Sequence, residues 1–265
     1  MALRSANVTV MIQAAHKAAR HLVRDFGEVE NLQVSVKGPG DFVSAADHRA
    51  EDILRRELGR ARPNFGFLLE EQGAVAGSDE AYRWIVDPLD GTTNFLHGLP
   101  HFAISIALEH RGELVAGVVY DPIKDEMFCA EKGAGAYLND RRLRVSGRGD
   151  LGSCLIGTGI PVLDWSGRGQ GFAAQLERIS DHVAGIRRLG TASLDLAYVA
   201  AGRLDGFWEY GLAPWDMAAG IVLVREAGGL VGRLEGDADL LAPGTLIASN
   251  AAIYSRLTEL LQPAE

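Results

Sequence analysis

The residues best suited to chemistry stand together in one short stretch, which reads WIVDPLDGTTNF at Trp84–Phe95. It opens with an apolar run that is typical of a buried strand, and this run stops at Asp87. A second carboxylate follows at Asp90, where it can cap whatever comes next. The small and hydroxyl-bearing residues at Gly91–Asn94 favour a turn and then a helix start. Two acids at a strand tip are therefore the first candidates for a functional site.

Pro88 strengthens this pattern because it fixes its own φ angle and keeps Asp87 extended, so that the Asp87 carboxylate projects from the strand tip. Gly91 lets another group approach the backbone closely. The amides of Gly91, Thr92 and Thr93 would be unpaired donors suited to a phosphate. Because two carboxylates repel a phosphate unless cations lie between them, the stretch favours a divalent metal such as Mg²⁺. Asp-Pro and Asp-Gly are also common turn formers, so this stretch alone leaves an ordinary turn open.

Other carboxylates end or begin apolar elements in the same way. The strand pattern at Phe65–Leu69 ends in a Glu-Glu pair that begins with Glu70. If this strand and the one before Asp87 are neighbours, Glu70 and Asp87 share one rim. Asp216 begins an almost wholly apolar helix, and a buried carboxylate there needs a partner, for which a metal is the natural choice. An ordinary acid at a helix N-terminus is the alternative. Glu209, on the preceding strand-like segment, can reach the same pocket.

Composition bounds the class of protein. The chain has 265 residues, 47% hydrophobic and 23% charged, which suffices for one large domain or two closely packed ones. A net charge of −9 argues against nucleic acid as the main ligand, whereas an anionic small substrate fits if a metal reverses the local field. No signal peptide and no run of membrane-spanning length is expected. The two cysteines, Cys129 and Cys154, lie in apolar strand-like runs and favour a reduced, cytoplasmic protein.

Apolar periodicity predicts a mixed α/β fold. The first half, with its hairpins, reads as α+β, and the second alternates strands and helices as in an α/β layer. We expect an α+β region at 1–145 that carries most metal ligands and an α/β region at 146–265 that closes the site, joined in one compact unit. The expected helices are Val8–Phe26, one starting within Ser44–Asp47, Phe172–Ile179, Thr191–Ala201, Trp215–Ala227 and Ala251–Leu261.

The expected strands fill most of the remaining chain. Gly38-Pro39-Gly40 breaks it early, and Gln72–Glu80 is rich in Gly, Ser and Asp, which predicts a mobile loop. Strands or extended segments are expected at Phe65–Leu69, Trp84–Val86, His101–Glu109, Leu114–Tyr120, Asp125–Ala130, Gly135–Leu138, Ser153–Thr158, Arg187–Leu189, Phe207–Tyr210 and Thr245–Ser249.

Four ordered motifs together resemble the inositol monophosphatase family of magnesium-dependent, lithium-sensitive phosphatases, and its bacterial branch in particular. DPLDGTTNF at Asp87–Phe95 is similar to the first family signature, and WDMAAGIVLVREAGG at Trp215–Gly229 is similar to the second. DFVSAAD at Asp41–Asp47 and the pair Glu70-Glu71 look like two further family elements. The resemblance covers nearly the whole chain and implies the layered α-β-α-β-α sandwich of the sugar phosphatases.

The resemblance also implies a set of metal ligands. Glu70, Asp87 and the carbonyl of Leu89 would hold the first Mg²⁺. Asp87, Asp90 and Asp216 would hold a second, so that Asp87 bridges the two ions. A third, weaker Mg²⁺ would lie near Glu70.

Substrate contacts and catalytic roles are implied in the same way. The phosphate would rest on the metals and on the amides of Gly91 and Thr92. Glu70 would orient a metal-bound water as the nucleophile, and Thr92, hydrogen-bonded to Asp47, would help to activate it. The hydroxyls of the substrate would meet Asp90, Glu209, Asp216 and the backbone at Gly190, Thr191 and Ala192. In one departure from the family, Leu69 stands where many members have Gly or Thr, beside Glu70 but outside the ligand set.

These residues imply a phosphomonoesterase that acts on inositol monophosphate or a related sugar or polyol phosphate. Histidinol phosphate, fructose 1,6-bisphosphate and a 3′-phosphonucleotide are alternative substrates within the class. A regulatory binding protein with weak catalysis is the alternative from another class. No Cys or His is placed as a phosphoryl acceptor, and no Walker-type loop is present, so direct attack by water is preferred and an NTPase is disfavoured. A homodimer is expected because it is the family's usual state.

Overall fold

The computed structural model describes residues 4–28, 34–38, 41–160, 168–236, 239–242 and 244–262. The expected break at Gly38-Pro39-Gly40 falls partly outside this range, because residues 39 and 40 are not among those described. Within the described part of the chain, no helix is long and apolar enough to cross a membrane.

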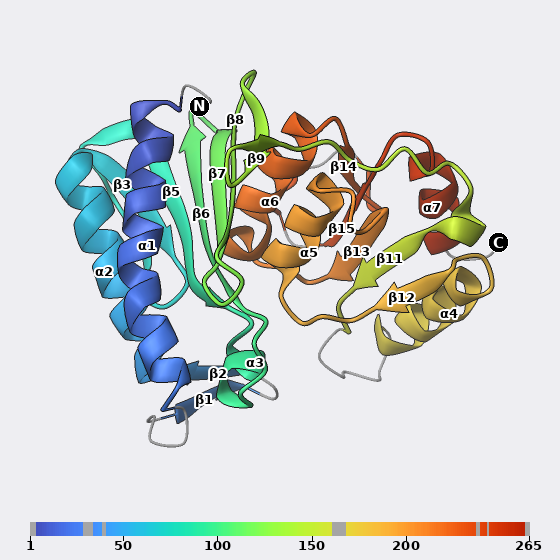
Figure 1. Cartoon of the computed structure of the whole chain (residues 1–265), viewed down its shortest axis with the longest axis horizontal. Helices are drawn as coiled ribbons and strands as arrows, with labels where there is room; N and C mark the ends of the chain where they lie inside the picture. Colours follow the sequence, from blue (N-terminus) through green and yellow to red (C-terminus); the bar gives the residue numbers. More distant parts are fainter. Residues whose placement is uncertain are drawn as a thin grey trace.

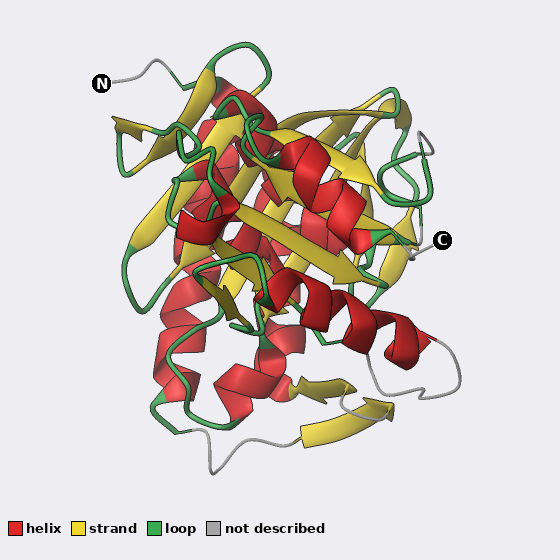
Figure 2. Ribbon diagram, turned by 90° about the vertical axis from the view of Figure 1, so that its right-hand side faces the viewer, coloured by secondary structure: helices red, strands yellow, loops and turns green. Residues whose placement is uncertain are grey.

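The described elements form five layers, as Figure 1 shows, and this confirms the mixed α/β sandwich. Figure 2, seen from the right-hand side of Figure 1, shows helices lying over the strands of a sheet. An eight-stranded sheet and a five-stranded sheet alternate with three pairs of helices. The outer pair at the left of Figure 1 is α1 (Ala6–Phe26) and α2 (Ala45–Ala61), the middle pair is α5 (Ala192–Ala200) and α6 (Pro214–Glu226), and the outer pair at the right is α4 (Arg168–Ser180) and α7 (Tyr254–Leu261).

The larger sheet has the strand order β10-β9-β8-β7-β6-β5-β3-β4 and is antiparallel except for the parallel pair β3 and β5. Its strands are β3 (Phe65–Leu69), β4 (Gly73–Val75), β5 (Asp79–Asp90), β6 (Ala103–His110), β7 (Glu113–Asp121), β8 (Glu126–Glu131), β9 (Gly135–Leu138) and β10 (Arg141–Arg142). A separate antiparallel hairpin consists of β1 (Val34–Gly38) and β2 (Asp41–Ser44). Most of this sheet is formed by neighbouring hairpins, as expected for the first half.

The smaller sheet has the order β12-β11-β13-β15-β14, with β11 parallel to both of its neighbours. Its strands are β11 (Leu155–Thr158), β12 (Gly185–Arg187), β13 (Gly206–Tyr210), β14 (Leu230–Arg233) and β15 (Thr245–Ser249). The division of the chain into regions 1–145 and 146–265 stays a prediction, although the two sheets fall on either side of that boundary.

The middle layer explains the unusual composition of α6. All residues from Met217 to Val224 are buried because the helix packs against both sheets and α5, so it has no face that must be polar. Two glycines allow the close packing. A Cβ atom on Gly220 would lie 2.5 Å from Leu196 of α5, and one on Gly117 of β7 would lie 2.5 Å from the carbonyl oxygen of Ala219.

The structure corrects several expected boundaries. β5 does not stop at Asp87 but runs to Asp90, with an irregular register against β6 between the two acids. The segment Gln72–Glu80 is not simply a loop, because β4 pairs with β3 and β5 already begins at Asp79. The short strands β1 and β14 were not expected either, since their pairing partners, and not their composition, define them.

Candidate active site

Two strand tips form one rim of the candidate site. β3 and β5 are parallel neighbours, with Leu69 opposite Val86, and the Glu70 amide donates a hydrogen bond to the Val86 carbonyl at 3.2 Å. The next residues, Glu70 and Asp87, therefore lie at the same edge of the sheet, as the sequence predicted. Asp87 is only 2% exposed, so its carboxylate is directed into the protein.

Gly91 makes the tight turn that follows β5. It has φ +93°, a conformation in which residues with a Cβ atom are strained, and it precedes the short helix α3 (Thr92–Leu96). A Cβ atom at this position would lie 2.5 Å from Oγ1 of Thr191 and 3.2 Å from the carbonyl oxygen of His101. The turn is thus packed directly against the segment that contains Gly190, which the sequence placed at the substrate.

A backbone amide anchors one oxygen of each of two acids, Asp87 and Asp216. The Leu89 amide donates to Asp87 Oδ1 at 2.9 Å, and the Ala213 amide donates to Asp216 Oδ2 at 2.7 Å. Each bond fixes the direction in which the second oxygen of that carboxylate points.

Asp90 departs from the expectation that it caps the helix directly after it. Its Oδ2 accepts a hydrogen bond of 2.7 Å from the amide of Ser193, in the first turn of α5, whereas α3 has no side-chain cap. The charge of Asp90 suits the N-terminus of α5, where amides lack intrahelical partners. This contact joins the turn after β5 to the middle layer.

The pKa values show that the acids act on one another. Burial raises the pKa of Asp87 well above its ordinary value, and the charges of Glu70, Asp90 and Asp216 raise it further. Burial likewise raises the pKa of Asp216 well above its ordinary value, followed by the charge of Asp90. Burial raises the pKa of Asp90 to about 6, against the opposing effect of its hydrogen bonds from Ser193. These carboxylates repel one another when ionised.

The repulsion among Asp87, Asp90 and Asp216 fits a bound cation, because a positive charge between them would neutralise it. Four buried or half-buried carboxyl groups offer only hard oxygen donors, which is the donor set of Mg²⁺ and not of zinc or copper. The side chains are not gathered as closely as bound ligands would be, since no group of three or more Asp, Glu, His or Cys residues in the described part of the chain forms a ready cluster. The donor chemistry therefore fits a hard divalent ion.

Asp47 and Thr92 are hydrogen-bonded to each other, as the family resemblance implied. Asp47 is 1% exposed in the first turn of α2, where it forms a capping box with Ser44. Oγ1 of Thr92 donates toward Asp47 Oδ1 and the Leu89 carbonyl, each at 3.0 Å. Burial raises the pKa of Asp47, and the hydrogen bonds from Ser44 and Thr92 oppose this shift. The pair thus connects α2 to the predicted phosphate turn.

Glu209 forms the opposite wall. It lies on β13, and burial together with the charge of Asp90 raises the pKa of Glu209 to about 8. The charge of Glu209 also acts on Asp216, so the two belong to the same site. Gly159 makes the room for it, because a Cβ atom there would lie 1.7 Å from Glu209 Oε1.

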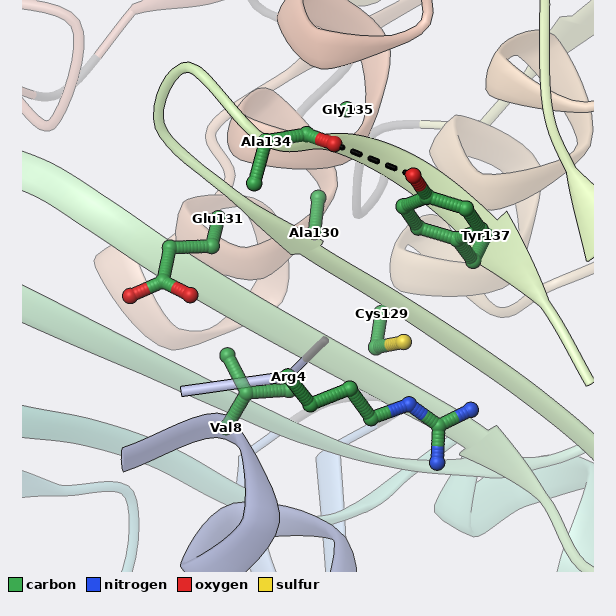
Figure 3. Close-up of a pocket in the computed structure, with 8 residues that line it drawn as sticks. All are labelled: Arg4, Val8, Cys129, Ala130, Glu131, Ala134, Gly135 and Tyr137. Carbon is green, nitrogen blue, oxygen red and sulfur yellow. Dashed lines mark hydrogen bonds between the residues drawn. The ribbon is translucent and has the colours of Figure 1, made fainter. Parts of the chain in front are cut away.

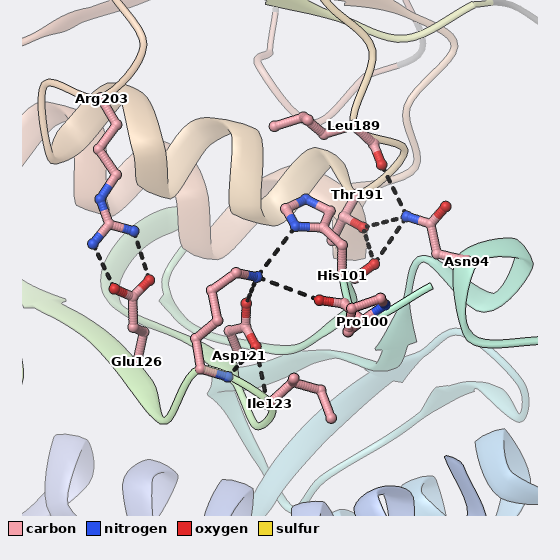
Figure 4. Close-up of polar contacts among 10 residues, drawn as sticks. Asn94, Pro100, His101, Asp121, Ile123, Glu126, Leu189, Thr191 and Arg203 are labelled. Carbon is pink, nitrogen blue, oxygen red and sulfur yellow. Dashed lines mark hydrogen bonds and ion pairs between the residues drawn. The ribbon is translucent and has the colours of Figure 1, made fainter. Parts of the chain in front are cut away.

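Asn94 holds the segment 189–191, part of which the family resemblance places at the substrate, by side-chain hydrogen bonds that Figure 4 shows. Its Nδ2 donates to the Leu189 carbonyl at 2.8 Å and to the His101 carbonyl at 2.9 Å. Oγ1 of Thr191 donates to the same His101 carbonyl at 3.1 Å. The backbone at Gly190 and Thr191 is therefore held beside Gly91 by side chains from separate parts of the chain.

The structure brings all the predicted site residues into this one region, while their individual roles stay predictions. Ala192 belongs with them, since its amide acts on the Asp90 carboxylate. Sequence reasoning missed Asn94 and also Glu51, a fully buried residue of α2 whose Oε2 accepts from the Glu71 amide at 2.8 Å. Glu51 stands four residues after Asp47, a spacing that places both acids on one helix face and could have identified it.

A pocket near the N-terminus is separate from these acids. Figure 3 shows it between Arg4, Cys129 and Tyr137, and its volume is about 50 Å³. It contains none of the predicted site residues. Both cysteines, Cys129 and Cys154, are buried and free, as expected.

Comparison with known proteins agrees with the geometry. Residues 4–264 match the profile described as the inositol monophosphatase family. The inositol-1-monophosphatase of Mesorhizobium japonicum is 59% identical over 96% of this chain and 95% of its own length. The Nus factor SuhB of Pseudomonas aeruginosa is 44% identical, over 97% and 96% of the two chains. The crystal structure of extragenic suppressor protein suhB from Bartonella henselae has a TM-score of 0.95 at 57% identity, covering 98% of this chain and 100% of that one.

The fold, the acidic rim and these matches define a metal-dependent phosphoric monoester hydrolase. More narrowly, the chain belongs to the inositol monophosphatase family.

Proposed function

We propose that the protein is a Mg²⁺-dependent phosphatase that hydrolyses inositol monophosphate or a related sugar or polyol phosphate. The observation that carries the proposal is the mutual repulsion of Asp87, Asp90 and Asp216 beside the turn at Gly91. Buried acids that raise each other's pKa values destabilise the fold unless a cation neutralises them, and a phosphate beside them needs the same cation.

The acids and one carbonyl would share the metal positions. Glu70, Asp87 and the Leu89 carbonyl would hold one Mg²⁺, and Asp87, Asp90 and Asp216 would hold another, with a third ion near Glu70. When bound, such cations neutralise the phosphate, lower the pKa of water and stabilise the leaving alkoxide. Uncatalysed hydrolysis of phosphate monoesters is among the slowest biological reactions, so this assistance is essential.

The remaining residues would bind and orient the reactants. Glu70 would accept a hydrogen bond from the attacking water and fix its direction. Asp47 would hold the Thr92 hydroxyl, whose oxygen is already placed between α2 and the turn. The amides of Gly91 and Thr92 would donate to the phosphate oxygens. The alcohol would lie against Glu209 and the backbone at Gly190–Ala192, which Asn94 holds in place.

The metal site does not distinguish the alcohol, so histidinol phosphate, fructose 1,6-bisphosphate and a 3′-phosphonucleotide are further substrates to compare. A regulatory binding role is the second candidate, favoured by the name Nus factor SuhB that the Pseudomonas aeruginosa relative carries. We also propose a homodimer in the cytoplasm, where two buried free thiols are stable.

Release of inorganic phosphate from this panel, with and without Mg²⁺, tests the function. We expect turnover only with the metal and almost none in Asp87→Asn, which loses the bridging ligand but keeps the strand. Asp181→Asn, at an exposed position in the turn after α4, is the matched control. A protein that releases no phosphate from any of these esters would leave the regulatory role as the better explanation.

A further inference from the structure

Glu51 is a fully buried acid of α2 with one oxygen engaged and one oxygen unpartnered. Oε2 accepts a hydrogen bond from the amide of Glu71 at 2.8 Å. Oε1 is also buried, and it has no hydrogen-bond partner within the described part of the chain. Burial raises the pKa of Glu51, and the hydrogen bond from the Glu71 amide opposes this shift. Because burying a carboxyl group costs stability, packing alone does not account for an acid at this position.

The hydrogen bond from Glu71 fixes the residue before it, Glu70. Both residues lie in the turn between β3 and β4. The Glu70 amide belongs to the peptide group before Glu70 and donates to the Val86 carbonyl at 3.2 Å. The Glu71 amide belongs to the peptide group after Glu70 and donates to Glu51. Because each peptide group is planar, anchoring both of them fixes the φ and ψ angles of Glu70 and hence the direction in which its side chain leaves the backbone.

One face of α2 holds both strand ends of the acidic rim. Asp47, one turn before Glu51, is hydrogen-bonded to Thr92 in the turn after β5, whereas Glu51 holds the turn after β3. Four residues of a helix rise about 6 Å, which is close to the spacing of about 4.8 Å between neighbouring strands. β3 and β5 are such neighbours, and α2 packs against β5. Asp47 and Glu51 are thus spaced to reach one strand end each.

We propose that Glu51 is a positioning residue that orients Glu70 for the binding of a divalent cation. The inference rests on the proposed function, which places Glu70 among the metal ligands. A residue that holds a ligand in place contributes to metal affinity without touching the metal, because the ligand is directed correctly before the ion binds. The hydrogen bond to the Glu71 amide, and not the negative charge, is the property of Glu51 that serves this role.

Two substitutions at Glu51 separate the hydrogen bond from the charge. Glu51→Asp keeps the charge but is shorter by one methylene, so its carboxylate is drawn away from the Glu71 amide. Glu51→Gln keeps the length and an oxygen that can accept from this amide, but it has no charge. We expect Glu51→Asp to raise the Kd for Mg²⁺ about tenfold, measured by isothermal titration calorimetry without substrate. In Glu51→Gln the Kd should stay within about threefold of the wild-type value.

Steady-state kinetics and a neighbouring residue provide the controls. The KM for inositol monophosphate at saturating Mg²⁺ should change by less than about twofold in Glu51→Asp, because affinity for the metal and not for the alcohol is altered. Asp52 is the next residue of α2, is exposed, and accepts from Nε2 of Gln72 at 3.0 Å in the same turn. Asp52→Ala removes this side-chain contact and should leave the Kd for Mg²⁺ unchanged.

An unchanged Kd for Mg²⁺ in Glu51→Asp would overturn the proposal. An equal rise in Asp52→Ala would overturn it too, because any loosening of the turn would then have the same effect. A large rise in Glu51→Gln with none in Glu51→Asp would show that the charge is decisive and would likewise refute the role. If wild-type protein binds Mg²⁺ but releases no phosphate from any ester, the proposed function fails and the titrations still decide about Glu51. If it binds no Mg²⁺, both proposals fail.

Discussion

Asp90→Asn should reverse the order of stability between variant and wild type when Mg²⁺ is added. Asp90 is central to the acidic site, because its charge raises the pKa values of four other carboxyl groups. These are Asp87, Asp195, Glu209 and Asp216. Asparagine removes the charge and still offers an amide oxygen to the Ser193 amide, so the cap of α5 is kept.

Without metal, the difference in the free energy of unfolding between Asp90→Asn and wild type follows from the pKa of Asp90. Its folded-state value of about 6 lies above the ordinary 3.8, so the folded protein binds the extra proton between these values. Stability from this group is therefore present below about pH 4 and is lost as the pH rises through about 6. The full shift would correspond to about 3 kcal/mol. Because the side chain is half-buried, we expect about 1 to 2 kcal/mol after discounting for solvent.

Added Mg²⁺ acts in the opposite direction. A ligand that binds only the folded state stabilises it by about 2.7 kcal/mol at a concentration of 100 times Kd. Asp90→Asn has lost one anionic ligand, so Mg²⁺ raises its free energy of unfolding by less than that of the wild type. Wild-type protein should therefore be the less stable of the two in EDTA at pH 8 and the more stable at saturating Mg²⁺.

Urea unfolding at pH 5 and pH 8, in EDTA and in Mg²⁺, measures all four conditions. Asp181→Asn, at an exposed acid in the turn after α4, controls for the change in net charge. If metal-free Asp90→Asn is less stable than wild type at pH 8, the carboxylates do not repel one another in the folded protein. The reasoning would also be refuted if the variant gained as much from Mg²⁺ as the wild type.

Three further predictions concern the walls of the site. Gly159→Ala should displace the Glu209 carboxylate and raise KM about tenfold, with a smaller change in kcat. Adding the shorter Glu209→Asp should restore part of the lost substrate affinity. An unchanged KM in Gly159→Ala would contradict the placement of Glu209 at the substrate. Asn94→Ala should lower the free energy of unfolding by about 2 kcal/mol and also lower kcat/KM, because the Leu189 carbonyl loses its side-chain donor and the His101 carbonyl keeps only that of Thr191. Unfolding in urea and steady-state kinetics check this, and wild-type values for both would contradict it. Burial and the nearby Lys124 lower the pKa of His101 to about 4, so the unfolded state binds more protons than the folded state below about pH 6.5. The free energy of unfolding should therefore fall as the pH drops from about 6.5 toward 4. His101→Gln should flatten this decline in the urea midpoint, and an equally steep decline in the variant would refute it.

The shared edge of Glu70 and Asp87 could be predicted from the sequence, because an apolar run followed by an acid is a local pattern, although β5 itself continues to Asp90. Glu70 and Asp87 share a rim for this reason once β3 and β5 are neighbours. The cap provided by Asp90 could not be predicted in this way. Its donor, the Ser193 amide, is 103 positions away, and nothing near Asp90 in the sequence indicates it.

Short strands also could not be predicted from local sequence. β4 lies in a stretch whose Gly, Ser and Asp content favours a loop, and only its pairing with β3 makes it a strand.

The position of the acids also explains why α5 and α6 lie in the middle layer. Asp87 is anchored locally by the Leu89 amide, but Asp90 depends on the first turn of α5, and Asp216 stands in the first turn of α6. The acids therefore reach one site only if α5 and α6 are held in a fixed position against β5 of the larger sheet. Two close contacts hold these helices in place, because a Cβ atom on Gly117 would lie 2.5 Å from the Ala219 carbonyl oxygen and one on Gly220 would lie 2.5 Å from Leu196 of α5. A larger residue at either glycine would thus alter the acidic site from a distance, by moving α6 and Asp216 with it.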